Sequence, residues 1–304
     1  MSGIGIRIRE IAAYRLGRPE RALETHRGQI LVLAYHNIRP RGAPPMGERS
    51  LHLAQQDFAR QLDFLVRTHQ VRPLADLSTS PADHRPTAVI TFDDGYRGAL
   101  SAGVEELGRR GLPATFFVAP GRLGDHTFWW DHLAEQSGGV MAADTRRHCL
   151  EALRGEDERV REWAARRPLD GARAVPAWGR TVTPEELERV AGLPGMTIAS
   201  HSWSHPNLAA LGAAEVATEL ERSAEWLNAR IPAALPWVSF PYGRVPANAR
   251  DAGPHAGYAG GVLIGEAVSW MAPPAPDTWT LMPRLNVAAG VSVERFALTT
   301  SGAW

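Results

Sequence analysis

Short apolar runs alternate with segments of helical periodicity along this chain, and this order constrains the fold more than any other feature. Residues 29–38, 86–92 and 113–120 read QILVLAYHNI, PTAVITF and PATFFVAP, which is typical of buried strands. Between them, residues 54–69 and 97–111 carry apolar side chains at helical spacing. Strands that alternate with helices predict an α/β fold with parallel strands and helices outside them.

The second half of the chain continues this alternation. Apolar runs around residues 196–200, 237–240, 256–265 and 280–287 predict four more strands. Thr183 is predicted to cap a helix whose first residue is a proline. The helical segments and strands form one continuous series, without an internal repeat or a low-complexity stretch.

Composition limits the partners of the chain. The 304 residues include 33 Lys plus Arg and 33 Asp plus Glu. The chain therefore lacks the excess of basic residues that would indicate binding to nucleic acid. The one cysteine, Cys149, excludes an internal disulfide. No segment approaches the roughly 18 apolar residues of a membrane span, and the first residues do not resemble a signal peptide. We therefore expect a cytoplasmic protein without a transmembrane segment, with a helical extension over 1–29 and one domain over 30–304.

Polar residues follow several of the predicted strands at the point where each ends. They are His36, the pair Asp93–Asp94, His201 and Tyr242. The carboxyl ends of parallel strands meet at one mouth in a barrel, so these side chains are expected to converge. Two adjacent carboxylates after a buried strand need a compensating partner, although an Asx turn with solvated carboxylates is an alternative.

A histidine pair supplies a possible partner. His201 and His205 in SHSWSHP are four residues apart, and such residues share one face of a helical turn. Two neutral imidazoles and one carboxylate suit a divalent metal ion. Taken alone, however, such a pair is more often not a metal site.

The motifs together resemble one known family. TFDDGY at 91–96, SHSWSH at 200–205 and FPYG at 240–243 resemble the polysaccharide deacetylases of the NodB-homology type, carbohydrate esterase family four. The resemblance covers residues 30–295 and is nearest to a subset among intracellular glycan-assembly enzymes. It implies a single irregular parallel (β/α) barrel of seven strands. It also implies a metal-dependent hydrolase that removes an N-acetyl group from an amino sugar by means of metal-activated water.

The resemblance also assigns residues. It implies that Asp94, His201 and His205 bind the metal and that Asp93 is the catalytic base. The backbone N–H of Tyr242, in a turn shaped by Pro241, would stabilise the oxyanion, and Pro241 is also expected to contact the substrate. The donor set accepts zinc, our first expectation, as well as cobalt, nickel, manganese or iron.

Two family features are missing. The third motif normally carries an arginine where this chain has Ser239, and we expect Arg284 in LMPRLNV to replace it. The alternative is that Arg284 makes a surface or structural ion pair. The late histidine that acts as general acid is also absent, since the last histidine is His255 in a predicted loop. His36 is the best candidate for the acid. The alternatives are that His36 is a buried histidine that merely holds a loop, and that a water or the metal ion itself protonates the leaving amine.

The stretch FWWDHL is the predicted substrate wall. Trp129 and Trp130 would stack on a sugar, and Asp131 would accept hydroxyl hydrogen bonds. The alternative is that one tryptophan is core and the other caps the barrel. Two other functions remain open, namely a deformylase or amidase acting on a non-sugar amide, and a carbohydrate-binding barrel without activity. The sugar and the oligomeric state are not predicted.

Overall fold

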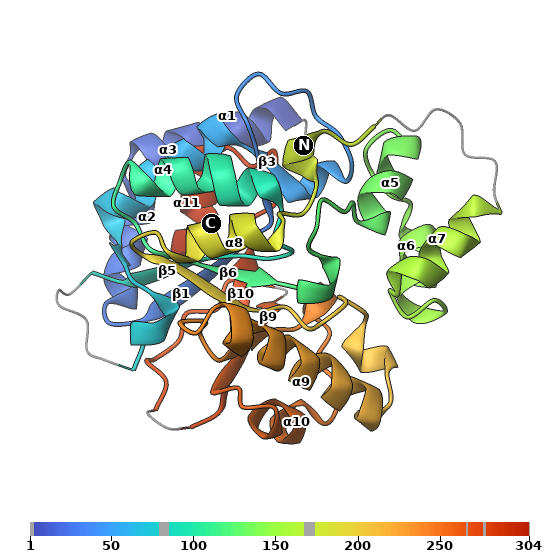
Figure 1. Ribbon diagram of the computed structural model, residues 1–304. Helices are drawn as coiled ribbons and strands as arrows, with labels where there is room; N and C mark the ends of the chain where they lie inside the picture. Colours follow the sequence, from blue (N-terminus) through green and yellow to red (C-terminus); the bar gives the residue numbers. More distant parts are fainter. Residues whose placement is uncertain (1–2, 79–84, 167–173, 266, 276–277, 304) are drawn as a thin grey trace.

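Parallel strands close into a barrel in the computed structural model of the chain. The structure describes residues 3–78, 85–166, 174–265, 267–275 and 278–303. The ring strands are β1 (Ile30–Tyr35), β5 (Thr87–Phe92), β6 (Ala114–Val118), β7 (Met196–Ser200), β8 (Trp237–Ser239), β9 (Gly260–Gly265) and β10 (Thr280–Asn286). Each strand pairs in parallel with the next in that order, beginning with β1 and β5, and β10 pairs with β1 to close the ring (Figure 1). The predicted seven-stranded α/β barrel is confirmed for the described residues.

Three short strands lie outside the ring. β2 (Asn37–Arg39) and β3 (His52–Ala54) pair with each other, and β4 (Gln70–Val71) pairs with the start of β5. The described helices are α1 (Gly3–Arg15), α2 (Arg18–Leu23), α3 (Gln55–Thr68), α4 (Val104–Gly108), α5 (Trp129–Gln136), α6 (Ala143–Glu151), α7 (Asp157–Ala165), α8 (Pro184–Ala191), α9 (Ala213–Arg230), α10 (Ala249–His255) and α11 (Val293–Ser301).

The barrel interior changes from apolar to polar along the strands. Val32, Val89, Phe117, Val262 and Met282 belong to one buried apolar cluster that fills its lower part. Since side chains on a strand alternate between faces, the residues two positions further along point inward as well. On β5 and β10 these positions are polar, and they lead directly to the carboxyl ends of the strands.

Local sequence signals account for some element boundaries and not for others. Thr183 caps α8 in a capping box, in which its hydroxyl accepts from the backbone N–H of Glu186, and the Glu186 carboxylate accepts from the N–H of Thr183. The loop predicted around His255 is wrong, because residues 249–255 form α10. Ala249 and Ala252 pack in an apolar cluster with Tyr258, and this burial outweighs the turn signal of the local Gly-Pro pair.

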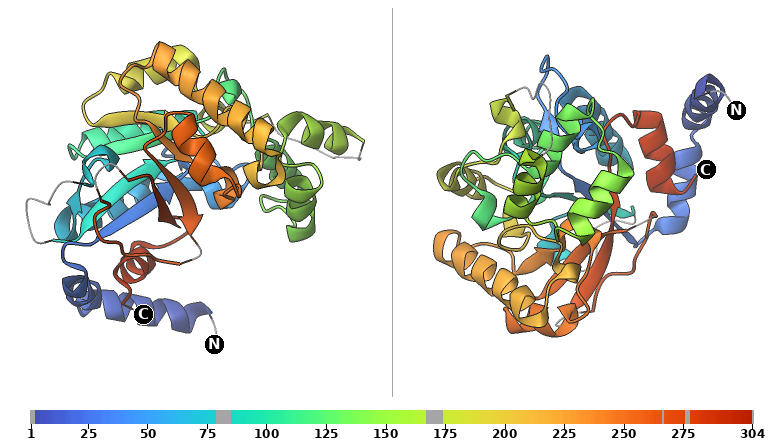
Figure 2. Two further views of the ribbon diagram at one scale, coloured as in Figure 1. Left: turned by 90° about the horizontal axis from the view of Figure 1, so that it is seen from below. Right: turned by 90° about the vertical axis from the view of Figure 1, so that its right-hand side faces the viewer.

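The first two helices lie against the last one. In Figure 2, α1 and α2 (blue) run beside α11 (red) on one side of the barrel, and residue contacts join all three helices. The boundary between an extension and the barrel domain stays a prediction.

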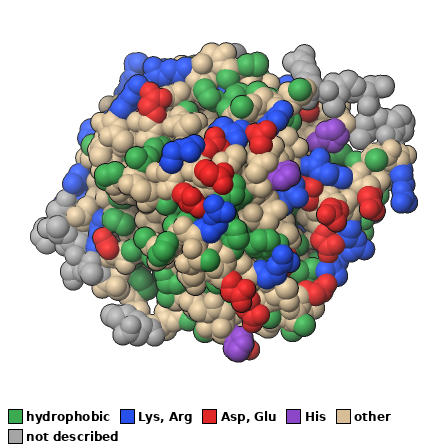
Figure 3. Space-filling model, in the orientation of Figure 1, with side chains coloured by type: hydrophobic (Ala, Val, Ile, Leu, Met, Phe, Trp, Pro, Cys, Tyr) green, Lys and Arg blue, Asp and Glu red, His purple; other side chains and the backbone are tan. Residues whose placement is uncertain are grey.

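No described helix could span a membrane, and the face drawn in Figure 3 has no patch of a single charge sign. Of the described helices, none combines the length and apolar character that would let it cross a bilayer. Acidic and basic side chains are interspersed across the face in Figure 3.

Candidate active site

The carboxyl ends of the barrel strands bring together residues that are far apart in the sequence. Asp93 and Asp94 follow β5, and His201 and His205 follow β7. Backbone bonds anchor the first member of each pair, from Asp93 N–H to Tyr35 O and from His201 N–H to Val118 O. Positive φ angles occur at Asp94, Ser202, His205 and Tyr242, among the six described non-glycine residues that have them. Such backbone conformations concentrate at functional sites, where the surrounding fold holds them in place.

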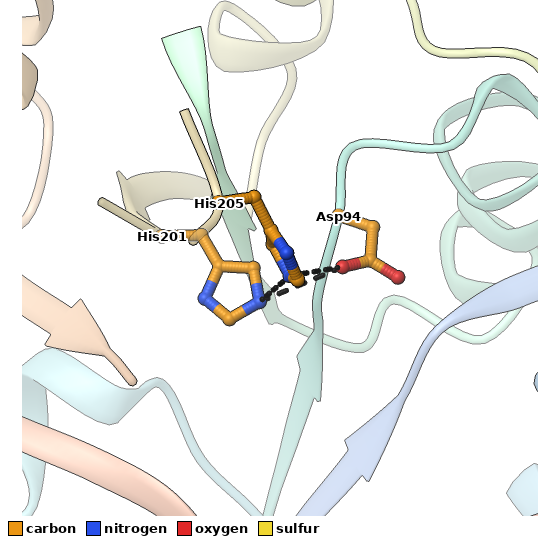
Figure 4. A group of neighbouring side chains, drawn as sticks. All are labelled: Asp94, His201 and His205. Carbon is orange, nitrogen blue, oxygen red and sulfur yellow. Dashed lines mark hydrogen bonds and ion pairs between the residues drawn. The ribbon is translucent and has the colours of Figure 1, made fainter. Parts of the chain in front are cut away.

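Asp94, His201 and His205 point toward one another in Figure 4. Oδ1 of Asp94 lies 3.5 Å from Nε2 of His201 and 3.1 Å from Nε2 of His205. The two Nε2 atoms are 3.2 Å apart. All three side chains are buried, with exposed fractions between 2% and 4%. One carboxylate oxygen and two imidazole nitrogens therefore crowd around one point.

This arrangement fits a divalent cation. Bonds of about 2.0–2.1 Å to a tetrahedral ion place ligand atoms about 3.3 Å apart, close to the separations found here. His201 Nδ1 lies 2.8 Å from the backbone oxygen of Ser239 and donates to it, so that Nε2 keeps its lone pair for an ion. The ligand atoms all lie within 4.8 Å of one another, and two imidazoles with one carboxylate are a common donor set for first-row metals.

Asp93 is held by an arginine rather than by the histidines. Nη1 of Arg284 donates to Oδ1 of Asp93 at 2.8 Å, and Nη2 donates to Oδ2 at 2.6 Å. Ser239 Oγ accepts from Nη2 of Arg284 at 2.7 Å and donates to Oδ2 of Asp93 at 3.3 Å. Arg284 is fully buried, stands over the Phe117 ring and donates to Thr91. A surface ion pair is thereby excluded for Arg284.

These contacts set the charge of the two carboxylates. Burial by itself would raise the pKa of Asp93, but the Arg284 guanidinium, helped by His201, outweighs it and lowers the pKa. Burial also opposes ionisation of Asp94, yet its close contacts with His201 and His205 hold its pKa well below the usual range. Both side chains are therefore carboxylates at neutral pH.

The surroundings shift the pKa values of His201 and His205 in opposite directions. Burial disfavours the charged form of His201, but Asp93 and Asp94 raise its pKa on balance. Burial lowers the pKa of His205 and of His36. His36 is half-buried and lies at the edge of the same cavity.

A cavity of about 200 Å³ opens above these residues. It is lined by His36, Ser50, Leu51, Asp93, Asp94, Trp129, Trp130, Arg146, His201, His205, Tyr242, Ile264 and Asn286. Pro241 is buried behind Tyr242 and is not part of this lining. Asn286 and Ile264 were missed from the sequence, although each lies two residues after an inward-facing position of its strand.

The two tryptophans are both core residues and cavity walls. Trp129 is 2% exposed and Trp130 is 4% exposed. Nε1 of Trp129 donates to the Tyr242 hydroxyl at 3.2 Å, and Nε1 of Trp130 donates to the Tyr96 hydroxyl at 2.8 Å. The indole N–H groups are therefore satisfied within the protein, and only ring surface faces the cavity.

Asp131 lies away from the cavity, contrary to the position expected for a substrate ligand. Its side chain is fully buried and accepts from His52 Nε2 at 2.9 Å, from the Tyr96 hydroxyl at 2.6 Å and from the Glu48 N–H at 2.9 Å. Asn37 Nδ2 lies 3.0 Å from His52 Nδ1 and donates to it, so His52 carries its proton on Nε2. These hydrogen bonds fix Tyr96 and, through it, Trp130, so Asp131 supports the cavity wall from behind.

Comparison with known proteins identifies a related family. The sequence pattern of the family described as "Polysaccharide deacetylase" matches residues 80–261 of the chain. No curated protein matches the sequence at a significant level.

Solved structures with the same fold share little sequence. BC0361, a polysaccharide deacetylase from Bacillus cereus, aligns with a TM-score of 0.60 and 15% identity over 90% of this chain and 69% of its own. The deacetylase PplD of Streptococcus pyogenes, solved with acetate, gives 0.59 and 16% over 90% and 99%. IcaB from Ammonifex degensii gives 0.60 and 14% over 90% and 97%.

Proposed function

The chain belongs to the polysaccharide deacetylase family, and from this membership and the geometry of its site we propose that it is a metal-dependent hydrolase that removes the N-acetyl group from an amino sugar. The convergence of Asp94, His201 and His205 beside an arginine-bound Asp93 is the observation that carries the proposal. The PplD structure was solved in complex with acetate, the product that such a reaction releases.

Asp94, His201 and His205 would hold the metal, with zinc as the first choice and cobalt, nickel, manganese or iron as the others. A divalent ion bound there supplies Lewis acidity, which activates water and polarises an acyl carbonyl. The three side chains share one centre, so the loss of any one of them removes a ligand without moving Asp93 away from Arg284.

Asp93 is proposed as the general base. Arg284 keeps it ionised, so its carboxylate is ready to accept a proton from the attacking water at neutral pH. Bidentate contact also fixes the direction of the carboxylate, which a single hydrogen bond would leave free to rotate. Arg284 thus takes over the orienting role of the arginine that the family pattern has at the position of Ser239.

The remaining roles are assigned by position. The Tyr242 residue adopts φ of 59° in the turn after β8, which suits a backbone N–H aimed at a developing oxyanion. His36 at the cavity edge is proposed to protonate the leaving amine. Trp129 and Trp130 are proposed to contact the sugar through their ring surfaces, whereas Asp131 is proposed only to support them. A cytoplasmic location stays a prediction.

The test joins metal content to acetate release. Wild type, Asp93→Asn and His201→Ala are purified, bound divalent metal is measured, and acetate is assayed with UDP-N-acetylglucosamine and a panel of N-acetyl glycosides and non-sugar amides. We expect about one metal per chain in wild type and Asp93→Asn, none in His201→Ala, and acetate from wild type alone. Release from non-sugar amides only would point to an amidase. Metal binding without any hydrolysis would favour a binding barrel.

A further inference from the structure

Arg146 brings a positive charge to the cavity, and no role in deacetylation uses it. It lies on α6, in the segment between β6 and β7 that extends to one side of the barrel (Figure 1). Of the described cavity-lining residues, Arg146 is the one with a permanent positive charge. The guanidinium is close enough to Tyr242 to oppose the rise in its pKa that burial causes.

Neighbouring arginines have carboxylate partners, whereas Arg146 has none among the described residues. Within the described part of the chain, no carboxylate lies within ion-pair distance of Arg146. The contrasting pairs on α6, α7 and the turn between them are Arg147–Asp144 at 2.9 Å, Arg154–Glu156 at 2.7 Å, Arg159–Glu156 at 3.7 Å and Arg161–Asp157 at 2.6 Å. No carboxylate among the described residues therefore competes with an anion from outside the chain for Arg146.

The carboxylates of the cavity do not fill this role. Asp93 has both oxygens engaged by Arg284, and Asp94 faces the two histidines. An anion at the cavity mouth therefore meets Arg146 without facing an uncompensated carboxylate. A guanidinium also matches the paired oxygens of a phosphate or carboxylate better than it matches sugar hydroxyls.

The size of the cavity suggests where the anion lies. At about 200 Å³ it is smaller than the roughly 300–1,000 Å³ of sites that enclose whole drug-sized ligands. It suits one acylated sugar ring, while the next substituent extends into the mouth. Arg146 is exposed there, so it is placed to contact that substituent and not the acetyl group.

We propose that Arg146 recognises an anionic group, a phosphate or a carboxylate, that the substrate carries next to its N-acetylated sugar. The proposal rests on the deacetylase function above and narrows its substrate class. Arg146 is a specificity residue in this account and takes no part in the hydrolytic step.

Turnover and binding are measured on the metal-loaded full chain. The turnover panel pairs neutral N-acetylglucosamine and its dimer with N-acetylglucosamine 1-phosphate and 6-phosphate, UDP-N-acetylglucosamine and N-acetylmuramic acid. We expect kcat/KM to be about 10- to 100-fold higher for at least one anionic member, the gain that a charge-assisted contact supplies. Arg146→Gln should remove this preference, and the matched control Arg147→Gln should keep it. Comparing the phosphate-bearing sugars with the carboxylate-bearing sugar shows which anion Arg146 recognises.

Binding separates this proposal from the proposed function. Calorimetry on Asp93→Asn, with and without Arg146→Gln, compares N-acetylglucosamine with its anionic derivatives and needs no turnover. A preference for the anion that Arg146→Gln abolishes supports the proposal, even if no acetate is released. Equal binding of neutral and anionic sugars, or an Arg146→Gln effect of the same size on both, overturns it, while acetate release from neutral sugars would leave the deacetylase function intact.

Discussion

Arg284 contacts both carboxylate oxygens of Asp93 from a strand 191 residues further along the chain. Neither group is accessible to solvent to any useful extent, with exposed side-chain fractions of 0% and 3%. Removing one member of a buried charge pair leaves the other uncompensated, which is far more costly than losing an exposed pair. The catalytic behaviour of Asp93 therefore depends on Arg284.

Arg284→Gln should lower kcat/KM by about 10²- to 10³-fold. Without the guanidinium, burial raises the pKa of Asp93, so the base is protonated over a wider range and the acidic limb of the pH–rate profile moves to higher pH. Steady-state kinetics across pH, with metal content measured in parallel, test this. Ser239→Ala, which removes a single hydroxyl, should cost less than about tenfold. Full kcat and an unmoved acidic limb in a metal-bound Arg284→Gln would refute the assigned role.

His36→Gln should lower kcat for an N-acetyl substrate by about 10²-fold and leave metal content unchanged, as expected for a lost proton donor. An O-acetyl ester expels an alkoxide, which is a far weaker base than the amide anion that an unprotonated nitrogen would leave as, so the ester needs less help from a proton donor. The deficit should therefore be smaller for the ester. Kinetics with a matched amide and ester compare the two, and an equal deficit on both, together with a lowered melting temperature, would support the loop-holding alternative.

Asp131→Ala should destabilise the fold by about 2–4 kcal/mol. The substitution leaves His52 Nε2–H, the Tyr96 hydroxyl and a backbone N–H without their shared acceptor. Urea unfolding of the purified protein measures the loss. Asp144→Ala is the control, because its pair with Arg147 is exposed and should contribute less than about 1 kcal/mol. A loss no larger than that of the control would show that the buried network is not important for stability.

His69 should make the fold sensitive to mild acid. Burial, with smaller contributions from Arg85 and His26, lowers its pKa from 6.5 to about 3. Below pH 6.5 the unfolded chain therefore takes up a proton that the folded chain excludes. The contribution of His69 to the free energy of unfolding is complete above pH 6.5 and declines as the pH falls from 6.5 toward 3.

His69→Phe, which keeps an aromatic ring beside Trp270, should flatten this decline. The measurement is the free energy of unfolding in urea at pH values between 4 and 7. His255→Gln is the control, since His255 is 80% exposed and its replacement should leave the slope unchanged. Parallel curves for wild type and His69→Phe would contradict the expectation.

Sequence reasoning reached the alternation of parallel strands and helices because hydrophobic periodicity and caps are local signals, and the family resemblance supplied the seven-stranded barrel. The strand run before Asp93 and the capping box at Thr183 both appear where they were expected. The loop expected at His255 failed, because contacts with distant residues decide whether that segment is helical.

In the candidate site too, the residues in local motifs were predictable and the long-range contacts of Asp131 were not. The Asp94, His201 and His205 cluster was predictable because its two motifs, each weak alone, together resemble those of the deacetylase family. The setting of Asp131 was not predictable, because its hydrogen-bond donors come from His52 and Tyr96, 79 and 35 residues away. A carboxylate among tryptophans looks like a sugar ligand when only its neighbours in the sequence are visible.

The distance along the chain between Asp93 and Arg284 also has a consequence for biosynthesis. When a ribosome has released β5 and β7, the nascent polypeptide already holds both aspartates and both histidines, but the strand that carries Arg284 is still to be translated. Until β10 joins the ring, Asp93 has no guanidinium beside it, and the barrel has an open edge next to β1. Long-range pairing of this kind forms late in folding. Maturation of the base is thereby coupled to closure of the barrel, so an incomplete chain has the metal-binding residues without an oriented Asp93.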